Sequence, residues 1–426
     1  MDHTTLVLTV AATAVAAVVL LVTWLRVPAF IALAAASLFV GVATGMPLAE
    51  AARAFQSGVG DTLGFIAMIV GIGTIVGKLL AESGGALVVS RSVLAALGEA
   101  RTEWALMLSA LVIGLAVFFQ VGLVLLVPVL FTLARDSGAP LLRLAIPMLA
   151  GLSVAHGLTP PHPGPLAAIE RLGADTGLTL LYSAIVGVPV AIVAGPVFGR
   201  LISRRVALRP GAMAGQLTGT DGVTRPPSLV ATLATILLPV ARMLVTSPLV
   251  AMLAAAFLSL YTFGTACGLD RARLLRFAED AIPAVAGVLL VVGAGGGFGR
   301  VLDAAAVDSA IADVMGTLRL SPLALGWSIA ALLRLAVGSA TVACVTAASI
   351  VAPMSAAMPH VGRELMVIAI GAGSLIASHV NDGGFWLVKE YFNMSVPQTV
   401  ATWTAMETII ALAGLAGVLL LALVVA

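Results

Sequence analysis

Long apolar stretches separated by short polar connections dominate the sequence. A helix needs about 20 apolar residues to cross the hydrocarbon core of a bilayer. The pattern predicts ten transmembrane helices, at residues 5–25, 28–44, 61–80, 144–166, 177–200, 229–247, 249–267, 281–299, 365–386 and 403–425. Such a pattern is typical of an all-α polytopic membrane protein, in which every spanning segment satisfies its own backbone hydrogen bonds.

Two further apolar regions, 104–134 and 322–357, are too long for one span and are interrupted near their middles. The first is interrupted at Phe119-Gln120-Val121-Gly122 and the second at Gly338-Ser339-Ala340-Thr341. Irregular backbone at membrane depth is tolerated only where protein or a water-filled cavity covers it. We therefore predict two re-entrant helical hairpins, each entering and leaving the membrane on one side, with these stretches at their tips.

The sequence contains an internal repeat. The glycine pattern of residues 69–80 returns at residues 291–302, and Leu152 and His156 match Leu375 and His379 at almost the same offset. Each half then holds five spans and one hairpin, and because five is odd, the second half is inverted relative to the first. Inverted repeats are typical of secondary transporters, whose substrate site lies where the repeats meet.

This repeat predicts a domain organisation. We expect an N-terminal repeat at 1–200 and a C-terminal repeat at 229–426, joined by a basic cytoplasmic linker at 201–228. The first repeat holds the hairpin 104–134 and a broken helix at 144–166. The second holds the hairpin 322–357 and a broken helix at 365–386.

Composition excludes several classes of protein. Hydrophobic residues make up 61% of the chain, charged residues only 10%, and mean hydropathy is +1.14. Soluble domains carry about 25% charged residues, so a soluble enzyme and a disordered chain are excluded. The net charge of +2 indicates no nucleic-acid partner. Cys267 and Cys344 lack metal-ligand spacing, so we expect neither metal nor cofactor.

The positive-inside rule orients the helices. With the N-terminus outside, fifteen Lys and Arg residues fall on the cytoplasmic side and six outside, while Arg334 falls within the membrane. The apolar stretch 5–25 is too long for the hydrophobic region of a signal peptide, so we expect it to remain as the first transmembrane helix.

Polar groups at membrane depth mark the candidate site. Residues 156–165 contain four prolines, which interrupt a span because proline removes a helical amide donor. Residues 378–386 contain a Gly-Gly pair, which we expect to break a second span. Broken helices build substrate and ion sites in transporters. We predict that the substrate is bound by Gln120, Val121, Gly122, Thr159, His162, Gly338, Ser339, Ala340, Thr341, His379 and Asn381.

Asp382 is the candidate for carrying a coupling proton, tuned by His379 and His162. It is an ionisable group in a broken helix. Because a charged side chain is costly at membrane depth, an intramembrane acid is a candidate functional residue. The alternative is that Asp382 only caps the interrupted helix. The substrate carboxylate is expected to be held by backbone amides and hydroxyls at the hairpin tips, with Arg334 as the alternative ligand.

Several of these stretches resemble the gluconate permease family, the gluconate:proton symporters. The resemblance is most specific at residues 157–165, 334–343, 378–386 and 389–393. It implies proton-coupled import of small hydroxylated carboxylates across a bacterial inner membrane. Through the wider ion-transporter superfamily it also implies a homodimer, embedded in lipid, that moves its substrate by an elevator motion.

One position departs from that family. Residue 120 is Gln, where the family has Glu, and an amide cannot take up or release a proton. Coupling must then use another group, use sodium, or be lost. An uncoupled or sodium-coupled carrier of glycerate or a D-serine-like acid therefore stays open.

Other classes of membrane protein fit less well. Residues 151–155 miss the G-x-S-x-G pattern of a serine hydrolase at the last position, and there is no H-E-x-x-H pair. Residues 73–79 resemble a nucleotide-binding loop but are one residue short. These motifs were the marks of a membrane-embedded enzyme and of an ATP-driven pump. A channel is the third alternative, because two inverted halves with broken helices favour alternating access without excluding a leak.

Overall fold

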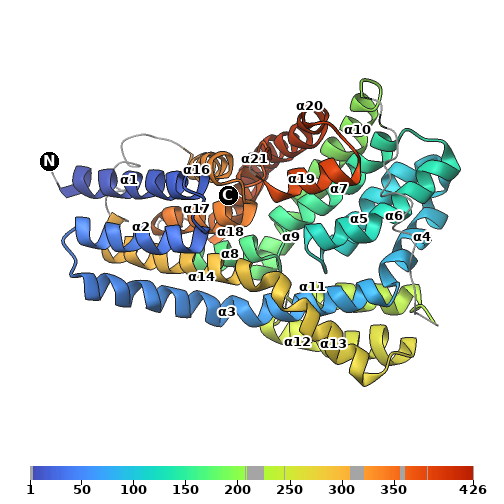
Figure 1. Ribbon diagram of the computed structural model, residues 1–426, viewed down its shortest axis with the longest axis horizontal. Coiled ribbons are helices and arrows are strands. Elements are labelled where there is room, and N and C mark those ends of the chain that lie inside the picture. Colours follow the sequence, from blue (N-terminus) through green and yellow to red (C-terminus); the bar gives the residue numbers. More distant parts are fainter. Residues whose placement is uncertain are drawn as a thin grey trace.

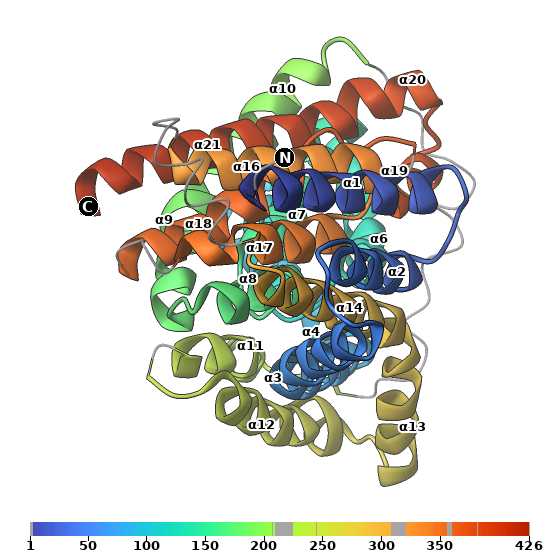
Figure 2. The same cartoon turned by 90° about the vertical axis from the view of Figure 1, so that its left-hand side faces the viewer.

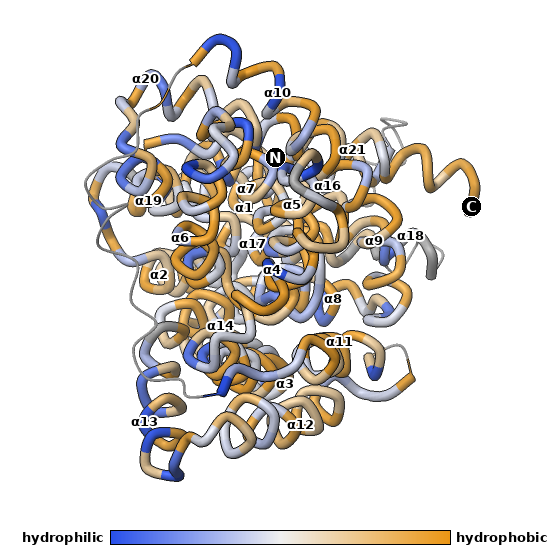
Figure 3. Tube along the Cα trace, turned by 90° about the vertical axis from the view of Figure 1, so that its right-hand side faces the viewer, coloured by the Kyte–Doolittle hydropathy of each residue, from blue (hydrophilic) through white to orange (hydrophobic). Residues whose placement is uncertain are grey.

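The computed structural model describes residues 3–206, 208, 225–243, 245–307, 321–355, 360–380 and 382–425. All regular secondary structure in these ranges is helical, which confirms the expected all-α class. Figure 3 shows hydrophobic residues along most helices, whereas hydrophilic residues gather at α13 (Arg271–Ala281) and around α10 (Phe198–Ile202).

The first half of the chain contains a long membrane helix, a helical hairpin and a broken helix. Its α-helices are α1 (His3–Thr23), α2 (Ala29–Ala43), α3 (Leu48–Glu82), α4 (Gly85–Leu97), α5 (Thr102–Gly114), α6 (Phe119–Ser137), α7 (Leu141–Leu158), α8 (Pro163–Leu172), α9 (Thr176–Ile192) and α10. A π-helical segment, η2 (Val193–Val197), connects the last two.

The second half follows in the same order of elements. Its α-helices are α11 (Leu229–Met243), α12 (Pro248–Ser259), α13, α14 (Pro283–Ala304), α16 (Pro322–Val337), α17 (Ala340–Ser355), α18 (His360–Gly373), α19 (Gly383–Tyr391), α20 (Val396–Thr399) and α21 (Ala405–Val425). Again a hairpin, α16–α17, precedes a broken helix, α18–α19. A π-helical segment, η6 (Val400–Thr404), then leads into the last helix. The inversion of one half relative to the other stays a prediction.

Eight helical stretches in the described ranges are long and apolar enough to cross a membrane. Seven coincide with predicted spans, and the eighth is α6, the second arm of the first predicted hairpin. The predicted spans 28–44 and 229–247 are not among them, because α2 and α11 have only 15 residues each. The predicted span 365–386 is interrupted between α18 and α19.

The first hairpin tip lies earlier in the sequence than expected. The helical break falls at residues 115–118, and α6 already begins at Phe119. Phe118 is extended and occupies the N-cap position, so Gln120 lies in the first helical turn rather than in a loop. At the second hairpin, Gly338 ends α16 in the left-handed conformation that glycine adopts without a Cβ penalty. Helix α17 then starts at Ala340.

Helices α3 and α14 carry the matching glycine patterns and lie against each other, as Figure 1 and Figure 2 both show. A Cβ at Gly58 would lie 2.5 Å from the carbonyl oxygen of Gly296. A Cβ at Gly296 would lie 2.0 Å from the hydroxyl of Thr62. Small residues thus allow the two backbones to approach closely, as is common in membrane helix pairs.

The two broken helices occupy the centre of the molecule. The stretch Leu141–Leu172 contains α7 and α8, and 89% of its most apolar 18-residue segment is buried. Helix α7 packs against α5 and α18 against α16, so each hairpin covers one broken helix. The C-terminal ends of α7 and α18, next to the two breaks, lie in contact. A Cβ at Gly371 of α18 would lie 2.4 Å from the carbonyl oxygen of Gly157 of α7. The helix ends of both halves are therefore brought to one place.

Candidate functional site

A cavity of about 760 Å³ lies where the hairpin tips and the helix breaks converge. Its walls come from both halves of the chain. They include residues 118–121 at the first tip, 337–342 at the second tip, 382–384 at the second break, Ser153, His156, Pro163, Arg334, Trp403 and Glu407.

Several helices begin at this cavity. The first residues of α6, α8, α14, α17 and α19 all line it. The first N–H groups of a helix have no acceptor within the helix, and its N-terminus carries about half a positive charge. The ends of α6 and α17 therefore favour an anionic ligand such as a carboxylate. Helix α8 offers fewer N–H groups, because Pro163 and Pro165 have none, and Asp382 already caps α19.

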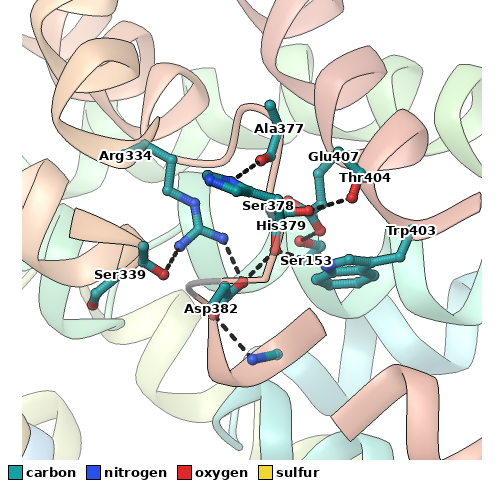
Figure 4. Close-up of polar contacts among 12 residues, drawn as sticks. Ser153, Arg334, Ser339, Ala377, Ser378, His379, Asp382, Trp403, Thr404 and Glu407 are labelled. Carbon is teal, nitrogen blue, oxygen red and sulfur yellow. Dashed lines mark hydrogen bonds and ion pairs between the residues drawn. The ribbon is translucent and has the colours of Figure 1, made fainter. Parts of the chain in front are cut away.

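An ion pair between Arg334 and Asp382 forms one wall of the cavity (Figure 4). The guanidinium Nη2 lies 2.5 Å from Asp382 Oδ2, and Nη1 donates to the carbonyl oxygen of Gly338. Asp382 also accepts hydrogen bonds from the Ser378 hydroxyl and, at 2.9 Å, from the backbone amide of Gly384. This last bond makes Asp382 the N-cap of α19. Arg334 thereby ties the second hairpin tip to the second helix break.

A second layer of hydrogen bonds fixes this break. Trp403 Nε1 donates to the Ser378 hydroxyl at 2.7 Å, and the Thr404 hydroxyl donates to the Ser378 carbonyl. Both donors belong to the π-helical segment η6. The wider π-helical turn therefore presents two neighbouring side chains to the irregular stretch between α18 and α19 (Figure 4).

Glu407, in the first turn of α21, reaches the cavity from another side. Only 1% of the residue is exposed, and one carboxylate oxygen accepts a hydrogen bond from Ser153 of α7. The other oxygen, Oε2, has no hydrogen-bond partner among the described residues. This carboxyl group therefore has far fewer partners than Asp382.

The predicted substrate residues divide into two sets. Those that line the cavity are Gln120, Val121, Gly338, Ser339, Ala340 and Thr341. The Ser339 oxygen also accepts from the amide of Val342 at 3.4 Å, in the first turn of α17.

The other predicted residues that the structure describes lie away from the cavity wall. Gly122 packs against Leu152, where a Cβ would lie 2.5 Å from a leucine methyl, and Thr159 is buried. His162 is buried, bonds to the Gly114 carbonyl at 2.7 Å, and faces a small, mainly apolar pocket. His379 bonds to the Ala377 carbonyl at 2.9 Å. Asn381 lies outside the described residues.

Several cavity residues were absent from the sequence-based prediction. Ser153, His156, Trp403 and Glu407 all line the cavity. Glu407 carried a usable signal, because an acid within the apolar stretch 403–425 is a candidate functional residue in its own right. Ser153 and Trp403 carried no comparable signal, since Ser is tolerated within membrane helices and Trp is enriched at the ends of spans.

The described residues contain no group of three or more His, Cys, Asp or Glu side chains arranged to hold a metal ion. Both cysteines are buried and free. Among the described residues, the polarity of the site therefore comes from the Arg334–Asp382 ion pair, helix ends, hydroxyls, Gln120, His156, Trp403 and the Glu407 carboxyl group.

Comparison with known proteins decides the family. The model of the GntP family permeases matches residues 5–247 and 241–424. The chain belongs to the GntP family of permeases. It is 45% identical to a gluconate permease of Pseudomonas aeruginosa, over 100% of this chain and 99% of the relative. It is 40% identical to the high-affinity gluconate transporter of Escherichia coli, over 98% of this chain and 100% of the relative.

Other relatives widen the comparison. This GntP family permease is 35% identical to the D-serine transporter DsdX of Escherichia coli, over 93% of this chain and 94% of the relative. Its fold is similar to the crystal structure of the Alcanivorax borkumensis YdaH transporter, with a TM-score of 0.65 and 16% identity over 92% of this chain and 96% of that one. The suspected resemblance is thus confirmed, and the chain is a multi-pass inner-membrane permease rather than an enzyme.

Proposed function

We propose that this permease imports a small hydroxy-carboxylate, gluconate or a related sugar acid, by proton symport with elevator-type alternating access. The observation that carries the proposal is the cavity at which several helix N-termini, two hairpin tips and two helix breaks meet. The names of the gluconate relatives support the substrate class.

The substrate carboxylate binds at the N-termini of α6 and α17. Arg334 is the less suitable primary ligand, because Asp382 already compensates its charge and each terminal nitrogen already donates one hydrogen bond. Ser339 and Thr341 supply hydroxyls near the same helix end, and Gln120 supplies an amide that can donate and accept. Neighbouring polar groups of this kind suit a ligand with a carboxylate and adjacent hydroxyls.

The remaining features of the proposal follow the sequence analysis. The protein acts as a homodimer in a bacterial inner membrane, with its N-terminus outside, and needs no cofactor beyond the coupling ion. Residues 1–200 and 229–426 form the two inverted repeats. Asp382, with His379 and His162, stays the sequence-based candidate for coupling.

Uptake into proteoliposomes without ATP tests the proposed function. Purified protein should take up labelled gluconate in a saturable manner and accumulate it when the outside is made acidic. Accumulation driven by a sodium gradient alone would show that sodium, and not the proton, is the coupling ion. A gluconate current that does not saturate would indicate a channel.

A second candidate function is sodium-coupled or uncoupled transport of glycerate or a D-serine-like acid. It is favoured by the similarity to the D-serine transporter and by Gln120 at the first hairpin tip. A thermal-shift panel of sugar acids, glycerate and D-serine separates the two, because a ligand that binds only the folded state raises the melting temperature. Stabilisation by D-serine but not by gluconate would favour this second function.

A further inference from the structure

Two carboxyl side chains from the described residues line the cavity, and they differ in their surroundings. Asp382 is paired with Arg334 and accepts further hydrogen bonds from Ser378 and Gly384. Protonating it would break an ion pair and leave a guanidinium uncompensated, which is costly in a buried site. Asp382 is therefore poorly suited to alternate between charged and neutral forms.

Glu407 has the opposite surroundings. Its carboxyl group is buried and no basic side chain in the described ranges forms an ion pair with it, so an ionised form would be an uncompensated buried charge. As a carboxylic acid it can accept from Ser153 on one oxygen and donate a proton from Oε2, which has no partner. The neutral form is thus favoured in the buried site, and ionising the group breaks no ion pair, so its change of charge acts directly on the cavity.

The charges near Glu407 leave its net environment close to neutral. Arg334 of α16 and Asp382 before α19 compensate each other, and His156 of α7 lies one turn from Ser153. The segments α9 and η2, which also pack against α21, carry no acidic or basic side chain. In α18 the acidic and basic residues are in its first two turns, where Glu364 bonds to the amide of Asp175.

We propose that Glu407 carries the coupling proton of this permease. An ionised Glu407 and a substrate carboxylate in one cavity repel each other strongly, because the protein interior screens charge weakly. Protonation removes the repulsion and provides a donor for the substrate, so proton and anion favour each other's binding, as linkage requires. This inference rests on the proposed function, since it assigns the proton of a proton symporter.

The transport cycle then balances. A proton from the outside binds the Glu407 carboxylate and gives the carboxylic acid, and one substrate anion enters the cavity beside it. After the cavity opens to the cytoplasm, the anion leaves and the proton follows, which regenerates the carboxylate. One proton accompanies one monovalent anion, so the step moves no net charge. A one-unit pH gradient can thus support about tenfold accumulation.

Proteoliposomes that contain the full-length protein test this assignment. For Glu407→Gln we expect that labelled gluconate no longer accumulates, with an inside-to-outside ratio near one, while exchange against internal gluconate at equal pH continues. Glu364→Gln is the matched control. Glu364 is equally buried and also has an unpartnered oxygen, but it does not line the cavity. This variant should accumulate gluconate like the unmodified protein.

The possible outcomes separate the proposals. Gradient-driven accumulation by Glu407→Gln overturns the assignment. Loss of accumulation in Asp382→Asn alone would assign the coupling proton to Asp382 instead. If the unmodified protein ignores the pH gradient, proton symport itself fails.

A second variant decides the case in which Glu407→Gln does not fold or loses exchange as well. Ser153→Ala keeps the carboxyl group but removes a donor that favours its ionised form. The pH profile of uptake should then shift to higher pH, and an unchanged profile overturns the assignment.

Discussion

On the proposed function, side chains in the cavity divide into substrate ligands and supports, and Ser339 and Thr341 are the proposed ligands. We predict that Ser339→Ala and Thr341→Ala each weaken gluconate binding by about 1 kcal/mol, the value of one neutral hydrogen bond. Titration calorimetry on purified protein measures this. Ser328→Ala is the control, because Ser328 bonds only within α16 and does not line the cavity. Unchanged affinity in the double variant would show that the substrate carboxylate does not bind at this helix end.

Arg334 belongs to the supports. We predict that Arg334→Gln destabilises the protein by about 3–5 kcal/mol, because Asp382 is left without its buried partner. The double variant Arg334→Gln/Asp382→Asn should recover part of this loss, since neither charge then stays unpaired. Unfolding midpoints in detergent measure the effect. A stable Arg334→Gln protein that binds no gluconate would instead make the guanidinium the substrate ligand.

At the residue scale, sequence reasoning named both hairpin tips and Asp382 among the residues that line the cavity, but missed most of its wall. The tip residues Gly338–Thr341 were found because glycine and hydroxyls interrupt an apolar region, which is a local signal. The contact between Glu407 and Ser153 could not be found this way, because 254 positions separate them and only packing of α21 on α7 joins them. The burial of His162 beside another pocket was also not predictable, since its direction depends on how α8 packs, and its role stays a prediction.

At the scale of elements, hydropathy predicted most helices but not all boundaries. The breaks after α7 and α18 were predictable from proline and glycine, which act locally. The start of α6 was not, because it depends on the extended backbone of Phe118. The 35-residue length of α3 was also missed, since its first turns carry polar residues that lower the hydropathy of the stretch.

The hairpins give a topological prediction. Single cysteines at Arg101 and Arg135, in a protein lacking Cys267 and Cys344, should both react with an impermeant thiol reagent from the cytoplasmic side. Both positions are exposed and flank α5 and α6. Glu103 is unsuitable for labelling, because it is buried between Arg143 and Arg200. Labelling of the two positions from opposite sides would make the hairpin a full span.

At the scale of the whole molecule, polar contacts join α8 to the α3–α14 pair, and the first turns of α14 also line the cavity. Arg171, at the end of α8, lies 3.1 Å from Asp303 of α14, and its neighbour Glu170 lies 3.4 Å from the Thr62 hydroxyl of α3. The opposite end of α8 lines the cavity at Pro163. In the proposed elevator motion, the hairpins and broken helices move past α3 and α14. These contacts should therefore exist in only one state of the cycle.

We predict that joining α8 to α14 stops transport. Cysteines at Arg171 and Asp303, in the background without native cysteines, should be linked by a short, reducible bifunctional thiol reagent. Gluconate uptake should then be lost and should return on reduction, because the linked helices cannot separate. Cysteines at Lys78 and Glu82, an ion pair within α3 itself, are the control. Their cross-link spans one helical turn and should leave uptake unchanged. Full uptake by the linked 171–303 protein would mean that α8 and α14 keep their contact throughout the cycle, and an elevator motion along that boundary would be wrong.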